Sequence, residues 1–128
     1  MDRYQNIIVG QFNGHTHNDD FKIFFDEDRP SALSYISPSI TPYTDINPGY
    51  KVFHFDGARD TAESTWEMVD YETFTYNLTE ANSVGQPIWY QLYSAKENYG
   101  LKSVRPEDMY DFVLRMAADD ALFQQFYV

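Results

Sequence analysis

The sequence has 128 residues, which is about the length of one domain and enough for a hydrophobic core. Its formal net charge of −11 at pH 7 disfavours nucleic acids and anionic membrane surfaces as electrostatic partners. Aromatic residues make up 18% of the chain, a high share that often marks surfaces and clefts that are half apolar and half wet.

Three further features bear on compartment and topology. The sequence has no cysteine, which argues against a small disulfide-bonded scaffold and leaves the redox compartment open. No run approaches the roughly 18 apolar residues of a membrane span. Residues 1–6 lead into only three aliphatic side chains before Gly10, so we expect no signal peptide in this chain. Taken literally, the sequence predicts a cytosolic protein, whereas the start of a piece of something longer would say nothing about location. Because it ends abruptly at Val128 without a polar tail, we expect it to be a truncated part of something longer.

From about residue 7 to residue 77 the pattern predicts strands separated by turns, without helical periodicity. We expect residues 7–9 to form a strand that is buried on both faces, as in a parallel sheet. Pro38 and Pro42 bracket an irregular stretch that is too proline-rich for a central strand. The other predicted strands cover residues 21–25, 33–37, 50–55 and 66–76.

A turn is predicted just before the strand at residues 50–55. In Asn47-Pro48-Gly49-Tyr50, proline presets the first central position of a type II turn and glycine suits the positive φ of the second. The strand that follows closes at Asp56-Gly57.

After Asn77 the pattern becomes helical. Trp89, Leu92, Tyr93 and Lys96 fall at helical spacing behind Pro87, and Gly100 predicts the end of that helix. A second helix is predicted to begin at Pro106, with an apolar stripe at Met109, Phe112, Val113 and Met116. A short apolar and aromatic run follows at residues 122–127. Strands followed by helices indicate the α+β class.

Gly14-His15-Thr16-His17 carries the chemistry of the sequence. On a strand, positions i and i+2 point the same way, so both imidazoles could face one site, and on a loop they could bind two adjacent ions. Gly14 would let the backbone turn sharply, and Asp19 could orient an imidazole from behind, although it could equally be a turn residue. In an arbitrary protein an isolated His-x-His is more often two surface histidines in a turn.

The context of this motif resembles the last metal motif of the calcineurin-like metallophosphoesterases. A resemblance to the acid sphingomyelinase family covers nearly the whole chain in order and is much more specific than His-x-His. It is carried by Arg3-Tyr4-Gln5-Asn6, by Gln11 to His17, by Pro38-Ser39-Ile40-Thr41-Pro42-Tyr43, by Asn47 to Tyr50, by Asp70-Tyr71-Glu72-Thr73, by Asn77 to Asn82 and by Tyr99-Gly100-Leu101.

The resemblance implies a two-layered β-sandwich flanked by helices, with two zinc ions between the strand ends. Residues 1–82 would be the second half of the catalytic domain, and residues 83–128 a truncated helical C-terminal region. His15 would bind one zinc and His17 the other, and the Tyr43 hydroxyl would hydrogen-bond the substrate phosphate.

The activity implied is hydrolysis of sphingomyelin to ceramide and phosphocholine, with nucleotides as the substrates of paralogues. The first-half motifs of the family, Asp-x-His, Gly-Asp-x-x-Asp and Gly-Asn-His, do not occur in this sequence. Zinc sites need about three or four protein ligands per ion. We therefore expect the chain alone to be inactive, with the missing N-terminal half of the catalytic domain as its partner.

The resemblance also implies a secreted or lysosomal full-length protein. Asn77-Leu78-Thr79 is a valid glycosylation acceptor, and such triplets also occur by chance in chains of this size. His54 matches no ligand of the family, which favours a structural histidine. The late aromatic residues are most simply core, while contact with a membrane surface is the alternative that a lipid substrate suggests.

Other classes compete with this interpretation. A cupin-like barrel also uses His-x-His on a strand, but Phe21 stands where it requires Glu, and Pro48-Gly49 lies too far from His54. Without the family, Tyr43 is more simply a packing or surface tyrosine. A non-catalytic, aromatic-rich binding module or a decayed pseudoenzyme fragment remains the alternative function, although a binding module leaves Gly14-His15-Thr16-His17 without a role.

Overall fold

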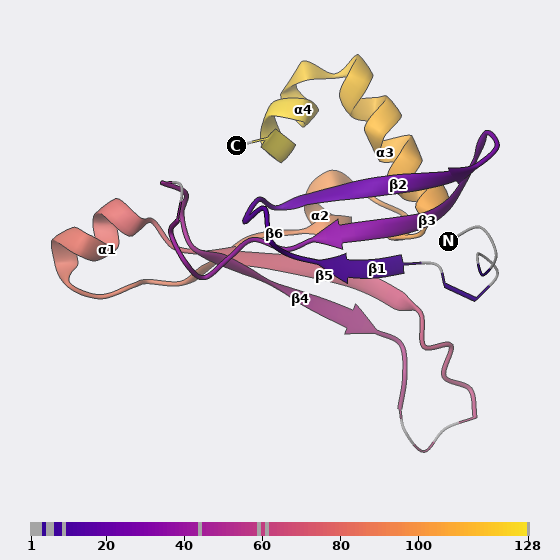
Figure 1. The fold of residues 1–128 in the computed structure, drawn as a ribbon, viewed down its shortest axis with the longest axis horizontal. Helices are drawn as coiled ribbons and strands as arrows, with labels where there is room; N and C mark the ends of the chain where they lie inside the picture. Colours follow the sequence, from indigo (N-terminus) through magenta and orange to yellow (C-terminus); the bar gives the residue numbers. More distant parts are fainter. Residues whose placement is uncertain are drawn as a thin grey trace.

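The computed structural model describes Tyr4 and residues 7–8, 10–43, 45–58, 60 and 62–127. Within this part of the chain, two three-stranded sheets and four helices form an α+β fold, as the sequence predicts (Figure 1). None of the helices there combines the length and the apolar character that crossing a bilayer requires.

The first sheet has the order β1-β3-β2. Its strands are β1 (Gly10–Asn13), β2 (Asp20–Asp26) and β3 (Arg29–Ile36), and β3 pairs in parallel with β1 and antiparallel with β2. The two predicted strands at residues 21–25 and 33–37 are thereby confirmed as β2 and β3. Because β3 is the central strand, its second half is the most buried part of this sheet.

The strand predicted at residues 7–9 is wrong for Ile7 and Ile8. Both residues precede β1, and they are 78% and 44% exposed. Val9 lies outside the described residues. Pairing with β3 begins only at Gly10, opposite Leu33, so the aliphatic pair has no neighbouring strand in the described part of the chain.

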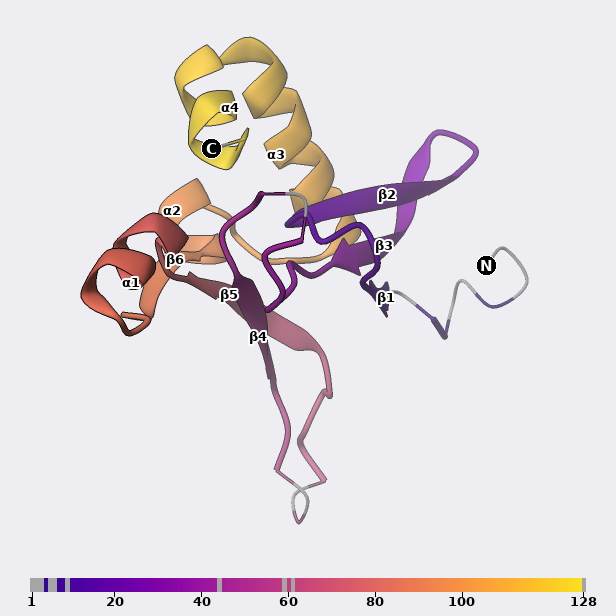
Figure 2. The same ribbon diagram turned by 60° about the vertical axis from the view of Figure 1, so that its left-hand side comes forward.

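The second sheet is antiparallel, with the order β4-β5-β6. Its strands are β4 (Gly49–Phe55), β5 (Met68–Thr75) and β6 (Tyr90–Ser94). At their hairpin end β4 and β5 extend away from the rest of the molecule (Figures 1 and 2). The strands predicted at residues 50–55 and 66–76 are confirmed.

The predicted type II turn with a left-handed Gly49 is wrong. Gly49 does not have a positive φ and is the first residue of β4, paired with Thr75. A Cβ atom on Gly49 would lie 3.1 Å from the Phe74 carbonyl oxygen and 3.1 Å from Pro38 Cγ. Close packing, and not a left-handed backbone, is what favours glycine here.

The helix predicted around Trp89 and Lys96 is also wrong. Residues 90–94 form β6, which pairs with β5, and only the short helix α2 (Ala95–Tyr99) follows. The predicted stop is confirmed, because Gly100 ends α2 in the left-handed conformation with a φ of 60°. Pairing with the exposed edge of β5 decides the structure of a segment whose apolar spacing also suits a helix.

The remaining helices are α1 (Leu78–Val84), α3 (Pro106–Ala118) and α4 (Asp120–Tyr127). The predicted apolar stripe of α3 is confirmed, since Met109 and Phe112 are fully buried. α3 lies over β2 and β3, and α4 packs beside α3 (Figure 1).

Aromatic rings from both sheets and from the helices meet in one core. The Tyr35 ring of β3 is 5.5 Å from that of Tyr71 in β5, and the Tyr99 ring stacks on Phe112 at 4.8 Å. The Tyr35 hydroxyl donates a hydrogen bond of 2.8 Å to the Val104 carbonyl. Buried aromatic rings therefore help to join the two sheets to each other and to the helices.

Candidate metal and phosphoester site

His15 and His17 lie in the loop that connects β1 to β2. His15 is exposed and His17 is half-buried. Both have positive φ angles, 85° and 64°, whereas the φ of Gly14 is not positive. The sharp turn that the sequence assigns to the glycine is therefore made by the histidines. Positive φ is unfavourable for residues with a Cβ and persists where the surroundings hold it, in turns and at functional sites. Glu27, Asp45 and Trp66 of this chain also have positive φ.

The structure brings His17 and Tyr43 together. Their rings meet edge to face, with centroids 6.0 Å apart and an interplanar angle of 76°. Tyr43 belongs to the irregular segment between β3 and β4 and is 71% exposed. Two side chains that are 26 positions apart in the sequence, and that the family resemblance assigned to one site, are thus neighbours at the surface.

Asp19 faces the second sheet. Its carboxylate forms an ion pair with Lys51 of β4, and it accepts hydrogen bonds from the Thr73 hydroxyl of β5 at 2.7 Å and the Tyr93 hydroxyl of β6 at 2.8 Å. The described contacts of this carboxylate are with these three strands. A role of Asp19 in orienting an imidazole directly stays a prediction.

Lys51 is a residue of this region that the sequence patterns do not predict. Its side chain is 2% exposed, and its ammonium lies 4.5 Å from the centre of the Tyr71 ring. Burial lowers the pKa of Lys51, and the negative charge of Asp19 opposes that shift. The sequence does indicate that Lys51 faces inward, because alternate residues of a strand lie on the same face and Lys51 is two positions before the apolar Phe53.

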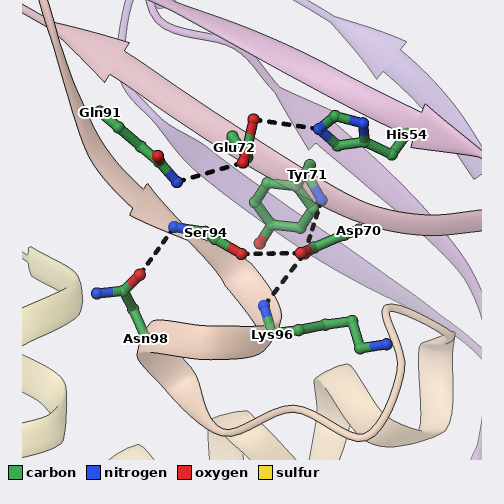
Figure 3. A network of polar contacts seen from close by, with 8 residues as sticks. All are labelled: His54, Asp70, Tyr71, Glu72, Gln91, Ser94, Lys96 and Asn98. Carbon is green, nitrogen blue, oxygen red and sulfur yellow. Dashed lines mark hydrogen bonds and ion pairs between the residues drawn. The ribbon is translucent and has the colours of Figure 1, made fainter.

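His54 is separate from this group. Its position next to Phe53 places it on the opposite face of β4 from Lys51. There its Nε2 atom is 3.1 Å from the Glu72 carboxylate, which also accepts a hydrogen bond from Gln91 (Figure 3). A partnered histidine on the outer sheet face agrees with the structural role expected for His54.

The Asp70 carboxylate fixes the end of the second sheet. It accepts hydrogen bonds from the Ser94 hydroxyl at 2.8 Å and from the backbone N–H of Lys96 at 3.1 Å (Figure 3). These bonds join β5 to the junction of β6 and α2. Asp70, which belongs to one of the segments that resemble the family, therefore has a structural role at this junction.

Asn77 is exposed at the junction of β5 and α1. Its side-chain oxygen accepts a hydrogen bond of 3.1 Å from the Glu80 backbone N–H, which caps the helix. The side chain is at the surface, as a glycan acceptor requires.

His15 and His17 are side chains of a type that binds zinc, but two ligands are too few to hold the metal. Imidazole nitrogen is a common zinc ligand, and His15 and His17 supply two such groups. In the residues that the structure describes, no cluster of three or more histidine, cysteine, aspartate or glutamate side chains could hold a metal ion. These two residues fit zinc only as part of a larger ligand set.

Comparison with known proteins identifies the family. The family model for the acid sphingomyelin phosphodiesterase C-terminal region matches residues 29–128. Sphingomyelin phosphodiesterase of Bos taurus is 45% identical over 131 residues, which cover 99% of this chain and 21% of the relative. The human sphingomyelin phosphodiesterase is 43% identical, with coverages of 98% and 20%.

A more distant human relative, acid sphingomyelinase-like phosphodiesterase 3b, is 31% identical over 136 residues, covering 98% of this chain and 29% of the relative. The chain therefore spans about a fifth of the length of the sphingomyelin phosphodiesterases it matches. The chain belongs to the acid sphingomyelinase family, in which it corresponds to the C-terminal region.

Proposed function

We propose that this chain supplies two zinc ligands and a phosphate-binding tyrosine to a phosphodiesterase that hydrolyses sphingomyelin to ceramide and phosphocholine. The observation that carries the proposal is the meeting of His17 and Tyr43 at the surface, beside His15, in a chain that matches sphingomyelin phosphodiesterases along almost all of its length. The remaining ligands would come from the catalytic segments that these relatives carry outside the matched region.

In this proposal His15 binds one zinc ion and His17 a second, each as a neutral imidazole. Two zinc ions, when bound, lower the pKa of a water molecule and stabilise the charge that develops on the phosphoryl oxygens. Positive φ at both histidines turns the backbone sharply within three residues, which suits the delivery of adjacent side chains to different ions.

Tyr43 has the complementary role. A phenol can donate its O–H to a phosphoryl oxygen, and the ring of Tyr43 lies against His17 while remaining largely exposed. In this proposal a phosphate bound beside His17 accepts a hydrogen bond from this hydroxyl.

The function is tested in a chimera in which this chain replaces the matching segment of the bovine enzyme. We expect the chimera to hydrolyse sphingomyelin, and the 128-residue chain alone, supplied with zinc, to show no turnover. The variant His15→Ala/His17→Ala should abolish the activity of the chimera, whereas His54→Ala, on the outer sheet face, should retain it. A chimera that folds but is inactive would refute the proposal. So would activity in the variant His15→Ala/His17→Ala.

The substrate class is tested in the same chimera. The family also includes a human relative named acid sphingomyelinase-like phosphodiesterase 3b, a name that states a likeness to sphingomyelinases. We expect the chimera to keep the preference of the unaltered bovine enzyme for sphingomyelin over a nucleotide phosphodiester, because identity of this chain to the sphingomyelin phosphodiesterases is higher. A preference for the nucleotide phosphodiester would favour nucleotides, and not sphingomyelin, as the substrate class.

We further propose that the protein is secretory or lysosomal and that Asn77 carries a glycan. Thr79→Ala removes the acceptor sequence while leaving the helix cap of Asn77 in place. When the chimera is expressed in mammalian cells, the loss of a glycosidase-sensitive mass is expected in Thr79→Ala and not in Thr79→Ser. If the glycosidase removed the same mass from both variants, the assignment of a glycan to Asn77 would be contradicted.

A further inference from the structure

The Lys51 ammonium has a complete set of partners inside the protein. It donates to the Tyr93 hydroxyl at 2.7 Å and to the Thr73 hydroxyl at 3.1 Å, and it forms the ion pair with Asp19. An ammonium group has about three N–H donors, so none is left for water. The side chain is accordingly almost completely buried.

The same hydroxyl groups also bind the other member of the pair. Thr73 and Tyr93 each accept from Lys51 and donate to Asp19, which closes the network around one carboxylate. Every strand of the second sheet contributes one contact to the Asp19 carboxylate: Lys51 from β4, Thr73 from β5 and Tyr93 from β6. Asp19, in contrast, belongs to the chain of the first sheet, directly before β2.

This arrangement fixes the end of the loop that carries the histidines. At the beginning of the loop, the Asn13 side chain donates to the Ser34 hydroxyl at 2.7 Å, and the Asn13 carbonyl accepts from the Ser37 N–H at 2.9 Å. At its end, Asp19 stands only two residues after His17. The loop is thus tied to the first sheet on one side and to the second sheet on the other.

Stability alone gives no reason for a lysine at this position. Burying an ammonium and a carboxylate costs desolvation free energy, and apolar pairs of similar volume often stabilise a fold equally well. What a lysine adds is direction, because an ion pair with two bridging hydroxyls holds the Asp19 carboxylate in one orientation. The residues at which that orientation matters are the left-handed His15 and His17.

We propose that Lys51 is a positioning residue for the metal-binding loop, which acts through Asp19 to hold His17 beside Tyr43. This assignment rests on the proposed function for its purpose, but its geometric content can be tested without metal or substrate. Lys51 does not contact the reacting atoms, so it is not a catalytic residue.

The test uses proton NMR of the 128-residue chain, with the ring resonances of His17 identified by comparison with His17→Gln. Cross-peaks between the rings of His17 and Tyr43 report the packing of the loop. The neutral pair Asp19→Asn/Lys51→Met is expected to lose these cross-peaks while its thermal unfolding stays cooperative. Lys51→Arg, which keeps the charge and its partner, is expected to retain them. The matched control Glu67→Gln/Arg105→Gln, which removes an exposed ion pair, should also retain them.

Thr73→Val gives a second test if the double variant fails to fold. It removes one bridging hydroxyl from the network with little change of volume, and weaker cross-peaks are expected. Their persistence at full intensity in the folded double variant, or in Thr73→Val, would overturn the proposal, as would their absence from the unmodified chain. An inactive chimera with intact cross-peaks would instead contradict the proposed function alone.

Discussion

Gly49 shows how a single residue can determine the fit between two segments. A Cβ atom at this position would lie 3.1 Å from both the Phe74 carbonyl oxygen and Pro38 Cγ, so these neighbours would have to move by a few tenths of an ångström to accept a methyl group. The Thr75 hydroxyl donates to the Pro48 carbonyl at 2.8 Å, which holds the neighbouring backbone in place. The sequence identifies Gly49 as important but assigns it the wrong reason, because a close approach between distant segments leaves no local pattern.

The variant Gly49→Ala tests this explanation. Overpacking a site whose neighbours are backbone and a proline ring is expected to destabilise the fold by about 1–3 kcal/mol, as measured by urea denaturation. Gly14→Ala is the matched control, since a Cβ atom at Gly14 would meet no atom within 4 Å. Equal unfolding free energies for the two variants would contradict the assignment.

The site could be predicted in part from single residues. The resemblance assigned His17 and Tyr43 to one site, and the structure places their rings side by side. Lys51 required knowledge of what packs against the inner face of β4. Its partner Asp19 is 32 positions away in the sequence. The two side chains form an ion pair only because the two sheets pack against each other.

At the scale of elements, sequence patterns succeed where the local signal and the tertiary environment agree. α3 combines a proline at its start, acidic residues in its first turn and a buried stripe, and all three features act in the same direction. β6 is the opposite case. Its apolar residues suit a helix, but hydrogen bonding to the edge of β5 and the contacts of Asp70 with Ser94 and Lys96 select a strand.

Gly100 tests the end of α2. Its φ of 60° is unfavourable for a residue with a Cβ atom, and its N–H bonds to the Lys96 carbonyl. We expect Gly100→Ala to reduce the free energy of unfolding by about 1 kcal/mol and Gly100→Asn to reduce it less, because asparagine tolerates the left-handed region. Urea denaturation of both variants measures the difference, and a reversed order would exclude a left-handed cap.

At the scale of the whole molecule, the two sheets are held together by buried tyrosines. Burial raises the pKa of four of them above the ordinary value of about 10: Tyr35, Tyr71, Tyr93 and Tyr99. Above that pH the unfolded chain releases phenolic protons that the folded chain keeps. The unfolded state then binds fewer protons, so stability falls as the pH rises.

The expected result is a steep alkaline loss of stability that begins near pH 10, with each such tyrosine contributing about 1.4 kcal/mol per pH unit. The lowered pKa of Lys51 acts in the opposite direction, but only below the ordinary lysine pKa of about 10.5, above which the lysine is deprotonated in both states. Urea denaturation at a series of alkaline pH values gives the slope. A stability that is constant or rising well above pH 10 would show that these phenols are not protected by burial.

The division of the chain at residue 82 stays a prediction, although one structural fact bears on its use. β6 lies after that point and pairs with β5, which lies before it, so the two segments share the second sheet. A variant cut at residue 82 would expose the edge of β5. The whole chain is therefore the unit to transfer into a relative.

His15 and His17 are proposed as zinc ligands, one for each of two ions. An anomalous difference map from crystals of the zinc-loaded chimera, recorded at the zinc absorption edge, tests it most directly. We predict two peaks, with one imidazole nitrogen of His15 about 2.0–2.1 Å from the first and one of His17 at the same distance from the second. Zinc peaks that neither imidazole contacts would rule out both histidines as ligands.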